Sequence, residues 1–192
     1  MPLVIVVGNP RPASRTLTVA AAAADAITRA AGLAAGRQTV DLCVLARHLL
    51  LPEPSPAVED AIDQVTAADL VLVASPTLKG TYSGLLKVFF DRLPNRALDR
   101  AVAVPLMVMA GPQHARAVDA HLRPLLTELG AAVPAPGLAV LESDLGRLDA
   151  VLGPWAGQVA RALEAFRPGS PGRPALPAAA HAASPARLGS AV

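Results

Sequence analysis

The chain has 192 residues, which is enough for one α/β domain with a substantial core and too few for two comfortable ones. Hydrophobic residues make up 53% of the chain and charged residues 17%, so most of it is expected to pack rather than stay disordered. The net charge is only +2 and the arginines are scattered without forming a basic stripe, which argues against a nucleic-acid partner.

The cysteine content points to a reducing compartment. The single cysteine, Cys43, lies in an apolar segment and is expected to be a small core residue rather than a nucleophile. One cysteine excludes an intrachain disulfide framework. The N-terminus lacks the basic segment of a signal peptide, and no apolar window reaches the roughly 18 residues that span a bilayer. We therefore expect a cytoplasmic protein without a membrane segment.

Apolar runs and helical spacing alternate along the chain in the order typical of an α/β protein. Pro105 is awkward inside a central strand and suggests a bulge. Five strands joined by helices predict an open parallel sheet with helices on both faces, for which the strand order 2-1-3-4-5 is common. Strands are predicted at 3–7, 39–45, 70–74, 101–109 and 133–141, and helices at 17–31, 58–68, 85–93, 115–129 and 152–166.

The last segment, 167–192, is rich in Pro, Gly, Ala and Ser and shows no apolar period. Such a segment cannot bury enough apolar surface to offset the entropy lost on ordering, so we expect a disordered tail. The folded domain is accordingly predicted to span 1–166.

The loop after the first strand, GNPRPASRT at 8–16, is the sharpest chemical signal in the chain. It leaves a buried strand and enters a helix, so its backbone N–H groups face whatever lies above the helix N-terminus. Small polar side chains and two arginines complete what we interpret as a phosphate-binding loop. The alternative is that Ser14 and Thr16 merely cap the helix while the arginines are solvated. The loop matches neither the GxGxxG fingerprint nor a P-loop.

A second polar loop, 75–83, follows the third strand and precedes the helix that Pro94 ends. In a parallel sheet it lies at the same carboxyl edge as the first loop, where ligands bind. It contains Lys79, which is either a ligand contact or a solvated loop residue. Lys87, one turn into the following helix, is expected to be structural.

A third loop, 110–114, follows the fourth strand and ends in His114. We interpret His114 as a candidate contact to a cofactor or substrate. A hydrolase triad of Ser14 and His114 is disfavoured, because the chain has no G-x-S-x-G elbow. The remaining histidines have no partners at metal-ligand spacing, so no metal site is predicted.

Together, GNPRPASRT and SPTLKGTYSGLLKVFFDRLP resemble the NADPH-dependent FMN reductase family, above all the reductases of two-component alkanesulfonate monooxygenase systems. In these a GSPR-x-x-SR-[ST] loop is followed by a [ST]-P-x-YKA-x-[YF]-SG-x-LK-x-x-x-D-x-LP segment. AVDAHLRPLLTELGA at 117–131 is similar to the family's D-x-x-LRP-[LV]-x-x-LGA helix. The resemblance covers 1–166 and implies a flavodoxin-like three-layer sandwich.

The resemblance implies that the first loop binds the phosphate of FMN and that the second flanks its isoalloxazine ring. It implies no catalytic side chain, because hydride transfer to the flavin needs positioning more than acid–base help. The implied phosphate residues are Asn9, Arg11, Ser14, Arg15 and Thr16, the implied ring residues are Pro76, Thr77, Leu78 and Lys79, and Gly111 begins a third loop over the ring edge, which His114 ends.

The chain departs from the family pattern at three positions. Asn9 stands where the family usually has Ser and can still donate a hydrogen bond. Leu78 replaces Tyr and removes a ring contact, and Gly80 replaces Ala, from which we expect a looser loop. Tyr82 lies about where alkanesulfonate-type reductases carry an aromatic insertion, at a π-bulge between subunits. Either that role or ordinary core packing is open for Tyr82.

We therefore predict an NAD(P)H-dependent FMN reductase that passes hydride from NADPH or NADH to FMN and supplies reduced flavin to a partner monooxygenase. The family implies a homodimer or homotetramer. Two alternatives stay open. One is an enzyme that retains FMN and reduces a quinone or azo compound, and the other is a flavin-binding electron carrier without nicotinamide turnover.

Overall fold

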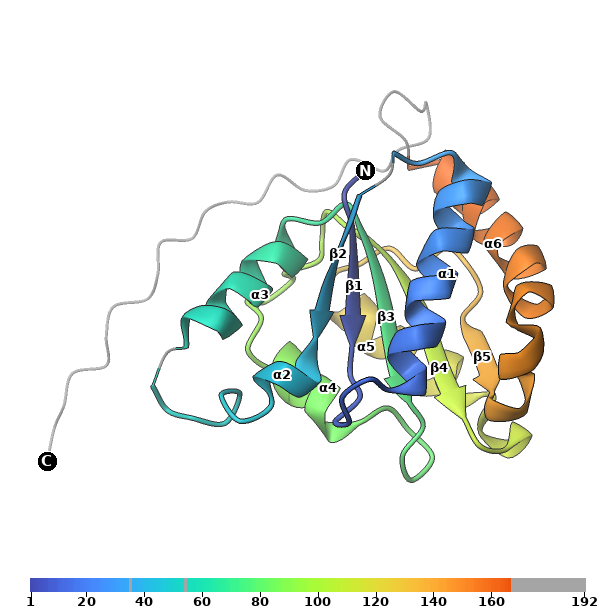
Figure 1. Cartoon of the computed structure of the whole chain (residues 1–192). Coiled ribbons are helices and arrows are strands. Elements are labelled where there is room, and N and C mark those ends of the chain that lie inside the picture. Colours follow the sequence, from blue (N-terminus) through green and yellow to red (C-terminus); the bar gives the residue numbers. More distant parts are fainter. Residues whose placement is uncertain (35, 54, 167–192) are drawn as a thin grey trace, which may run out of the picture.

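The computed structural model describes residues 1–34, 36–53 and 55–166, so the predicted tail at 167–192 lies outside the described residues. The strands form one parallel sheet in the order β2-β1-β3-β4-β5, which confirms the predicted topology (Figure 1). No helix in the described ranges is both long and apolar enough to cross a membrane. The elements are β1 Leu3–Val7, α1 Arg15–Ala31, β2 Arg37–Asp41, α2 Leu42–Leu45, α3 Pro56–Thr66, β3 Leu70–Pro76, α4 Gly84–Phe90, β4 Val102–Met109, the 3₁₀ turn η1 Pro112–His114, the π-helical η2 Val118–Leu122, α5 Arg123–Glu128, β5 Leu138–Leu141, the 3₁₀ helix η3 Glu142–Arg147 and α6 Leu148–Glu164.

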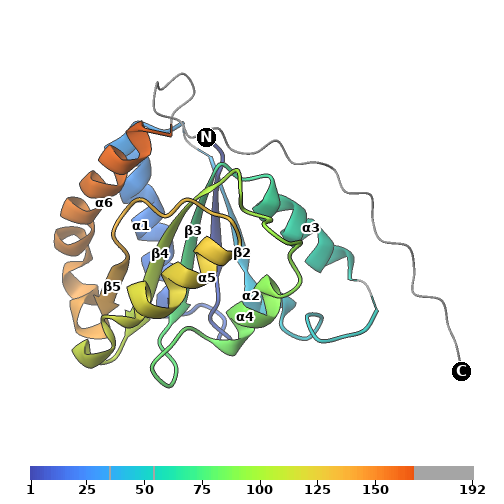
Figure 2. The same ribbon diagram turned by 180° about the vertical axis from the view of Figure 1, so that it is seen from behind.

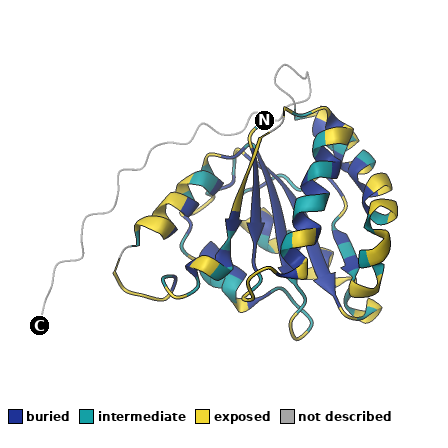
Figure 3. Cartoon of the chain, in the orientation of Figure 1, coloured by how far each residue is buried: buried dark blue, intermediate teal, exposed yellow. Residues whose placement is uncertain are grey.

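The sheet is covered on both faces by helices. In β1, Ile5 packs in the cluster that contains α1 and α6, whereas Val4 and Val6 pack in the cluster that contains α3, α4 and α5. Figures 1 and 2 show these two helical layers from opposite sides. The strands β1, β3 and β4 are buried almost throughout (Figure 3). Continuous aliphatic runs are what a parallel sheet buried on both faces requires.

The second strand ends at Asp41 rather than at residue 45, so the predicted strand 39–45 is wrong in its second half. The Asp41 carboxylate accepts a hydrogen bond from the Cys43 N–H (3.2 Å) and caps α2, which occupies the rest of that segment. A short acidic side chain that bonds the backbone two residues on favours a helix start over a continued strand.

Pro105 lies within β4 in register with Val73 of β3, so the predicted bulge is wrong. The Ala103 N–H donates to the Ala132 carbonyl (2.8 Å), on the side of β4 away from β3. Position 105 faces that same side, because N–H directions alternate along a strand. β5 pairs with β4 only from Leu106 onward. The proline therefore lies where β4 has no partner strand on that side. Its lack of an N–H costs the sheet no hydrogen bond there.

The fifth strand, predicted at 133–141, is confined to Leu138–Leu141. Pro134 and Pro136 lack the N–H that a ladder requires, so the preceding stretch cannot pair regularly. Trp155 of α6 donates its indole N–H to the Pro136 carbonyl (3.0 Å) and ties this irregular stretch to the helical layer. Its side chain is also buried against the core.

The predicted helix 115–129 is divided into the π-helical η2 and the α-helix α5. Pro124 has no N–H, and its ring would clash with the carbonyl four residues back, which favours a break or a widened turn in the helix before it. The N–H of Arg123 instead reaches the carbonyl of Val118, five residues back, which widens the turn.

Cys43 is half-buried rather than fully buried in the core, so that part of its prediction is wrong. Its thiol lies 3.6 Å from a carboxylate oxygen of Asp41 and donates to it. Partial burial, followed by the charge and the hydrogen bond of Asp41, raises the pKa of the Cys43 thiol. The thiol is therefore mostly protonated at neutral pH.

We expect Cys43 to react slowly with iodoacetamide at about pH 8 and to react faster in Asp41→Asn, because the thiolate is the reactive form and removal of the carboxylate lowers the thiol pKa. Mass spectrometry of timed samples measures both rates. Cys43→Ser supplies the background, and Asn can still cap α2. Equal rates in the two proteins would contradict the role given to Asp41.

Candidate functional site

Three loops leave the carboxyl edge of the sheet, as the sequence predicts. They follow β1, β3 and β4, and the arrowheads of these strands point to one end of the molecule (Figure 1). Glu142, the first residue after β5, lies at this edge as well. In parallel α/β sheets ligands bind at this edge.

The first loop is held in shape by its own side chains. Ser14 caps α1, since its Oγ accepts a hydrogen bond from the Leu17 N–H (3.2 Å). The Asn9 side-chain amide donates to the Thr16 hydroxyl (2.9 Å), and its carbonyl accepts from the Arg11 N–H (3.0 Å). Ser14 therefore caps the helix, as in the alternative to phosphate binding that the sequence left open. The N–H groups of Arg15 and Thr16, the first two residues of α1, have no place in this cap and lie at the end of the helix.

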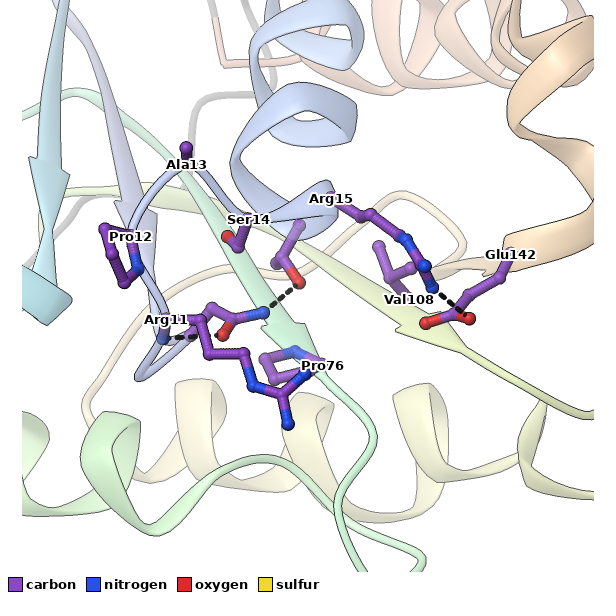
Figure 4. A pocket seen from close by; sticks show the side chains of 10 residues that line it. Arg11, Pro12, Ala13, Ser14, Arg15, Pro76, Val108 and Glu142 are labelled. Atoms are coloured by element: carbon purple, nitrogen blue, oxygen red, sulfur yellow. Dashed lines mark hydrogen bonds and ion pairs between the residues drawn. The ribbon is translucent and has the colours of Figure 1, made fainter.

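The loop forms one wall of a pocket at the N-terminus of α1, with Pro76, Val108 and Glu142 on the other side (Figure 4). Its volume is about 260 Å³, below the roughly 300–1,000 Å³ of pockets that enclose a drug-sized ligand, so it suits one end of a larger ligand. The first N–H groups of a helix lack helical partners, and the helix dipole adds positive charge there. These properties suit an anionic group. Of the predicted site residues, Asn9, Arg11, Ser14, Arg15, Thr16 and Pro76 line this pocket.

The two arginines of the pocket differ in their surroundings. Arg15 forms an ion pair with Glu142, which reaches the pocket from the start of η3. The Arg11 side chain extends across the pocket in Figure 4. Glu142 is missing from the residues predicted from the sequence. Its place directly after the fifth strand, at the ligand-binding edge, is the signal that indicates it.

The residues after Pro76 form a tight hairpin. The Leu78 N–H donates to the Thr81 carbonyl (2.8 Å), and the Thr81 N–H donates to the Leu78 carbonyl (3.3 Å). Between them Lys79 and Gly80 have φ angles of +54° and +84°, the left-handed values of a two-residue type I′ turn. Glycine is favoured at such a position, so Gly80 fits a defined turn, and the expected loosening of the loop stays a prediction.

The hairpin presents three of the predicted ring residues. Leu78 and Lys79 are exposed, and the Thr77 N–H at the base of the hairpin donates to the Val108 carbonyl (2.8 Å). The Thr77 hydroxyl is buried and has no hydrogen-bond partner in the part of the chain that the structure describes. A buried hydroxyl without a partner costs free energy. Thr77 therefore offers a bonding position to a ligand that covers the hairpin base.

The third loop lies beside the hairpin rather than in the pocket. The Nδ1 atom of His114 would be 3.9 Å from a Cβ at Gly80, which places the imidazole next to the turn. Gly111 begins this loop, and a Cβ there would meet the Gln113 side chain at 2.3 Å. The hairpin and His114 thus form a second cluster of predicted residues beside the pocket, and Gly111 begins the loop that carries His114.

A buried hydrogen-bond network joins the first two loops beneath the site. The Ser83 hydroxyl donates to the Gly8 carbonyl and accepts from the Leu86 N–H (3.1 Å), so Ser83 also caps α4. The Ser75 hydroxyl accepts from the Ser83 N–H (2.9 Å). Both serines are buried. Only glycine fits at position 8, because a Cβ would lie 2.6 Å from the Cβ of Leu86.

Tyr82 and Lys87 differ in how far the structure tests their predictions. Tyr82 is half-buried against the core, and the π-helical turn in the described residues lies at Val118–Leu122 rather than beside Tyr82. An intersubunit role for Tyr82 stays a prediction. Lys87 pairs with Asp91 one turn further along α4, in keeping with its predicted structural role.

The sequence comparisons point to one family. A family model described as NADPH-dependent FMN reductase matches residues 1–145. An FMN reductase (NADPH) of Escherichia coli is 43% identical over 77 residues, which is 40% of this chain and 40% of that protein. An FMN reductase (NADPH) of Pseudomonas aeruginosa is 34% identical over 110 residues, which is 56% of this chain and 58% of that protein. The chain thus matches about half the length of these curated relatives.

Solved structures match over more of the chain. An NADH:FMN oxidoreductase (EMOB) in its apo form has a TM-score of 0.73 and 29% identity, covering 86% of this chain and 87% of that one. An oxidoreductase from Corynebacterium diphtheriae has a TM-score of 0.74 and 26% identity, covering 84% and 96%. An archaeal flavodoxin, at a TM-score of 0.53 and 14% identity over 84% and 99%, shares the fold alone. The flavodoxin-like fold is confirmed.

Ser83→Ala is expected to lower the free energy of unfolding by about 2–3 kcal/mol, because it removes an N-cap and leaves the Gly8 carbonyl buried without its donor. Urea denaturation followed by circular dichroism measures the change. Ser143→Ala, at an exposed position, is the control and should stay within about 0.5 kcal/mol of wild type. A Ser83→Ala protein as stable as this control would show that the network contributes nothing.

Proposed function

The chain belongs to the NADPH-dependent FMN reductase family, and on that premise we propose that it transfers hydride from a nicotinamide coenzyme to FMN. The observation that carries the proposal is the pocket at the N-terminus of α1, which Arg11 and Arg15 line. The similar proteins of Escherichia coli and Pseudomonas aeruginosa are named FMN reductase (NADPH). Their names and this pocket support the same activity for this chain.

The pocket suits the phosphate end of FMN. A phosphate monoester is strongly anionic, and helix N–H groups together with an arginine fork are its usual ligands. The hydroxyls of Ser14 and Thr16 act as acceptors within the loop, so each keeps a proton to donate to a phosphate oxygen. We therefore assign the phosphate contacts to Ser14, Thr16, Arg15 and Arg11. Asn9, whose amide is used within the loop, positions them.

The hairpin suits the ring end of FMN. The unpartnered, buried hydroxyl of Thr77 would gain a partner in a polar atom of the flavin ring. Pro76 and the exposed Leu78 offer apolar surface to a flat ring. Lys79, next to them on the turn, offers a cation to the reduced, anionic flavin or to a coenzyme phosphate. Gly111 and His114 would then border the ring from the other side.

The contribution of the chain to the reaction is positional. When bound, FMN supplies a ring that accepts hydride from the nicotinamide. The hairpin and the third loop would orient the two rings against each other and limit the access of water between them. We assign no proton transfer to a side chain, and His114 serves as a contact at the edge of the site.

The coenzyme is NADPH or NADH, because similar proteins are named for both: the FMN reductases (NADPH) already mentioned, and an NADH-dependent FMN reductase SfnF of Pseudomonas fluorescens. From the resemblance of its loops to two-component reductases, we further propose that the protein delivers reduced FMN to a flavin-dependent monooxygenase and works as a homodimer or homotetramer. A cytoplasmic location fits the single cysteine.

We expect the purified protein to oxidise NADPH or NADH, followed by the loss of nicotinamide absorbance, and to do so faster when FMN is added. Arg15→Ala should raise the KM for FMN about tenfold with a smaller change in kcat, because a phosphate contact far from the reacting atoms contributes mainly to uniform binding. Arg29→Ala, exposed at the opposite end of α1, is the matched control and should behave as wild type.

Other results would redirect the proposal. Turnover that needs a quinone or azo dye, with FMN retained through purification, would favour the retained-flavin alternative. No oxidation of either coenzyme in excess FMN would leave a flavin-binding electron carrier. An unchanged KM for FMN in Arg15→Ala would contradict the assignment of the FMN phosphate to this pocket.

A further inference from the structure

A carboxylate lies in the pocket that the proposed function gives to a phosphate. Glu142 is the first residue of η3, and it lines the pocket opposite the first loop (Figure 4). Its carboxylate forms an ion pair with Arg15, the guanidinium assigned to the phosphate. In the pocket, the Glu142 carboxylate therefore already occupies the guanidinium of Arg15.

Arg15 can exchange Glu142 for another anion at little cost in free energy. The side chains of Arg15 and Glu142 are 63% and 41% exposed, and exposed ion pairs contribute little to stability. A phosphate monoester carries more charge than a carboxylate and accepts paired hydrogen bonds from a guanidinium, whereas Glu142 accepts from Arg15 through its Nη1. It therefore competes with Glu142 for Arg15. Once Arg15 has turned to the phosphate, Glu142 is left beside a second anion and repels it.

We propose that Glu142 sets how tightly the protein holds FMN: it competes for Arg15 and repels the phosphate, so that the flavin binds weakly and exchanges readily. This inference rests on the proposed function. Weak retention suits an enzyme whose product, reduced FMN, must leave the site. Glu142 acts on the phosphate end alone. The affinity for riboflavin, which has the same ring without a phosphate, does not depend on Glu142.

The same 3₁₀ helix offers a matched control. Asp144 pairs with Arg147 through both Nε (3.0 Å) and Nη2 (2.8 Å). It does not line the phosphate pocket. Neutralising Asp144 changes the charge of η3 by the same amount as neutralising Glu142 and leaves the pocket as it is.

The test is flavin binding without nicotinamide, measured by the quenching of flavin fluorescence in wild type, Glu142→Gln, Asp144→Asn and Arg15→Ala. Glu142→Gln keeps the side-chain size and is expected to bind FMN about three- to tenfold more tightly than wild type. Its affinity for riboflavin should match wild type, and Asp144→Asn should match wild type for both flavins. Arg15→Ala should bind FMN more weakly.

The outcomes separate this inference from the proposed function. FMN binding that is unchanged or weaker in Glu142→Gln, while Arg15→Ala still weakens it, overturns the inference and leaves the proposed function standing. Equal tightening in Asp144→Asn, or tightening of riboflavin, also overturns it, because the effect would then be general. A wild type that binds no FMN, or whose FMN binding is insensitive to Arg15→Ala, overturns both.

Discussion

The hydrogen bonds of Ser83 fix the relation between the two loops on which the candidate site depends. They connect the end of β1 to the start of α4 and, through Ser75, to the end of β3. The groups involved are buried, where water cannot replace a lost partner. Because Gly8 has no Cβ, Leu86 packs directly against the backbone there and leaves the first loop little room to shift. The edge of the sheet is therefore set by short side chains within the protein itself.

The two loops built on this network keep their shape by different means. The first relies on polar side chains, since Asn9 bonds to Thr16 within the loop and Ser14 caps α1 through the Leu17 N–H. The second relies on the backbone, as a two-residue turn closed by main-chain hydrogen bonds. Side chains of the second loop, such as Leu78 and Lys79, are consequently left on the surface. A change of side chain there would alter the ligand contacts more than the fold.

Interactions that are local in the chain could be predicted from the sequence. The buried runs at 70–74 and 101–109 indicated central strands, and the alternation with helices indicated the observed strand order. The loop 8–16 was placed correctly because a strand, a polar loop and a helix follow one another without a gap. That these loop residues contact FMN stays a prediction.

Interactions between distant segments could not be predicted. Ser83 and Gly8 lie 75 residues apart in the chain, and no local pattern pairs them. Glu142 and Arg15 lie 127 residues apart, so although the predicted fifth strand ends directly before Glu142, no local pattern pairs this acid with the first loop. The C-terminal end of β2 and the division of the helix at Pro124 were missed for another reason. There a single side chain overrides the average preference of its segment.

The prolines around β5 also bear on how the molecule behaves in a crowded solution. β5 is an edge strand of four residues, and Pro134 and Pro136 precede it with no N–H to offer. A long edge with free donors and acceptors is a template for intermolecular strand pairing, the first step of amyloid-like aggregation. The same prolines that precede β5 therefore limit to four residues the ladder that a second molecule could extend at this edge.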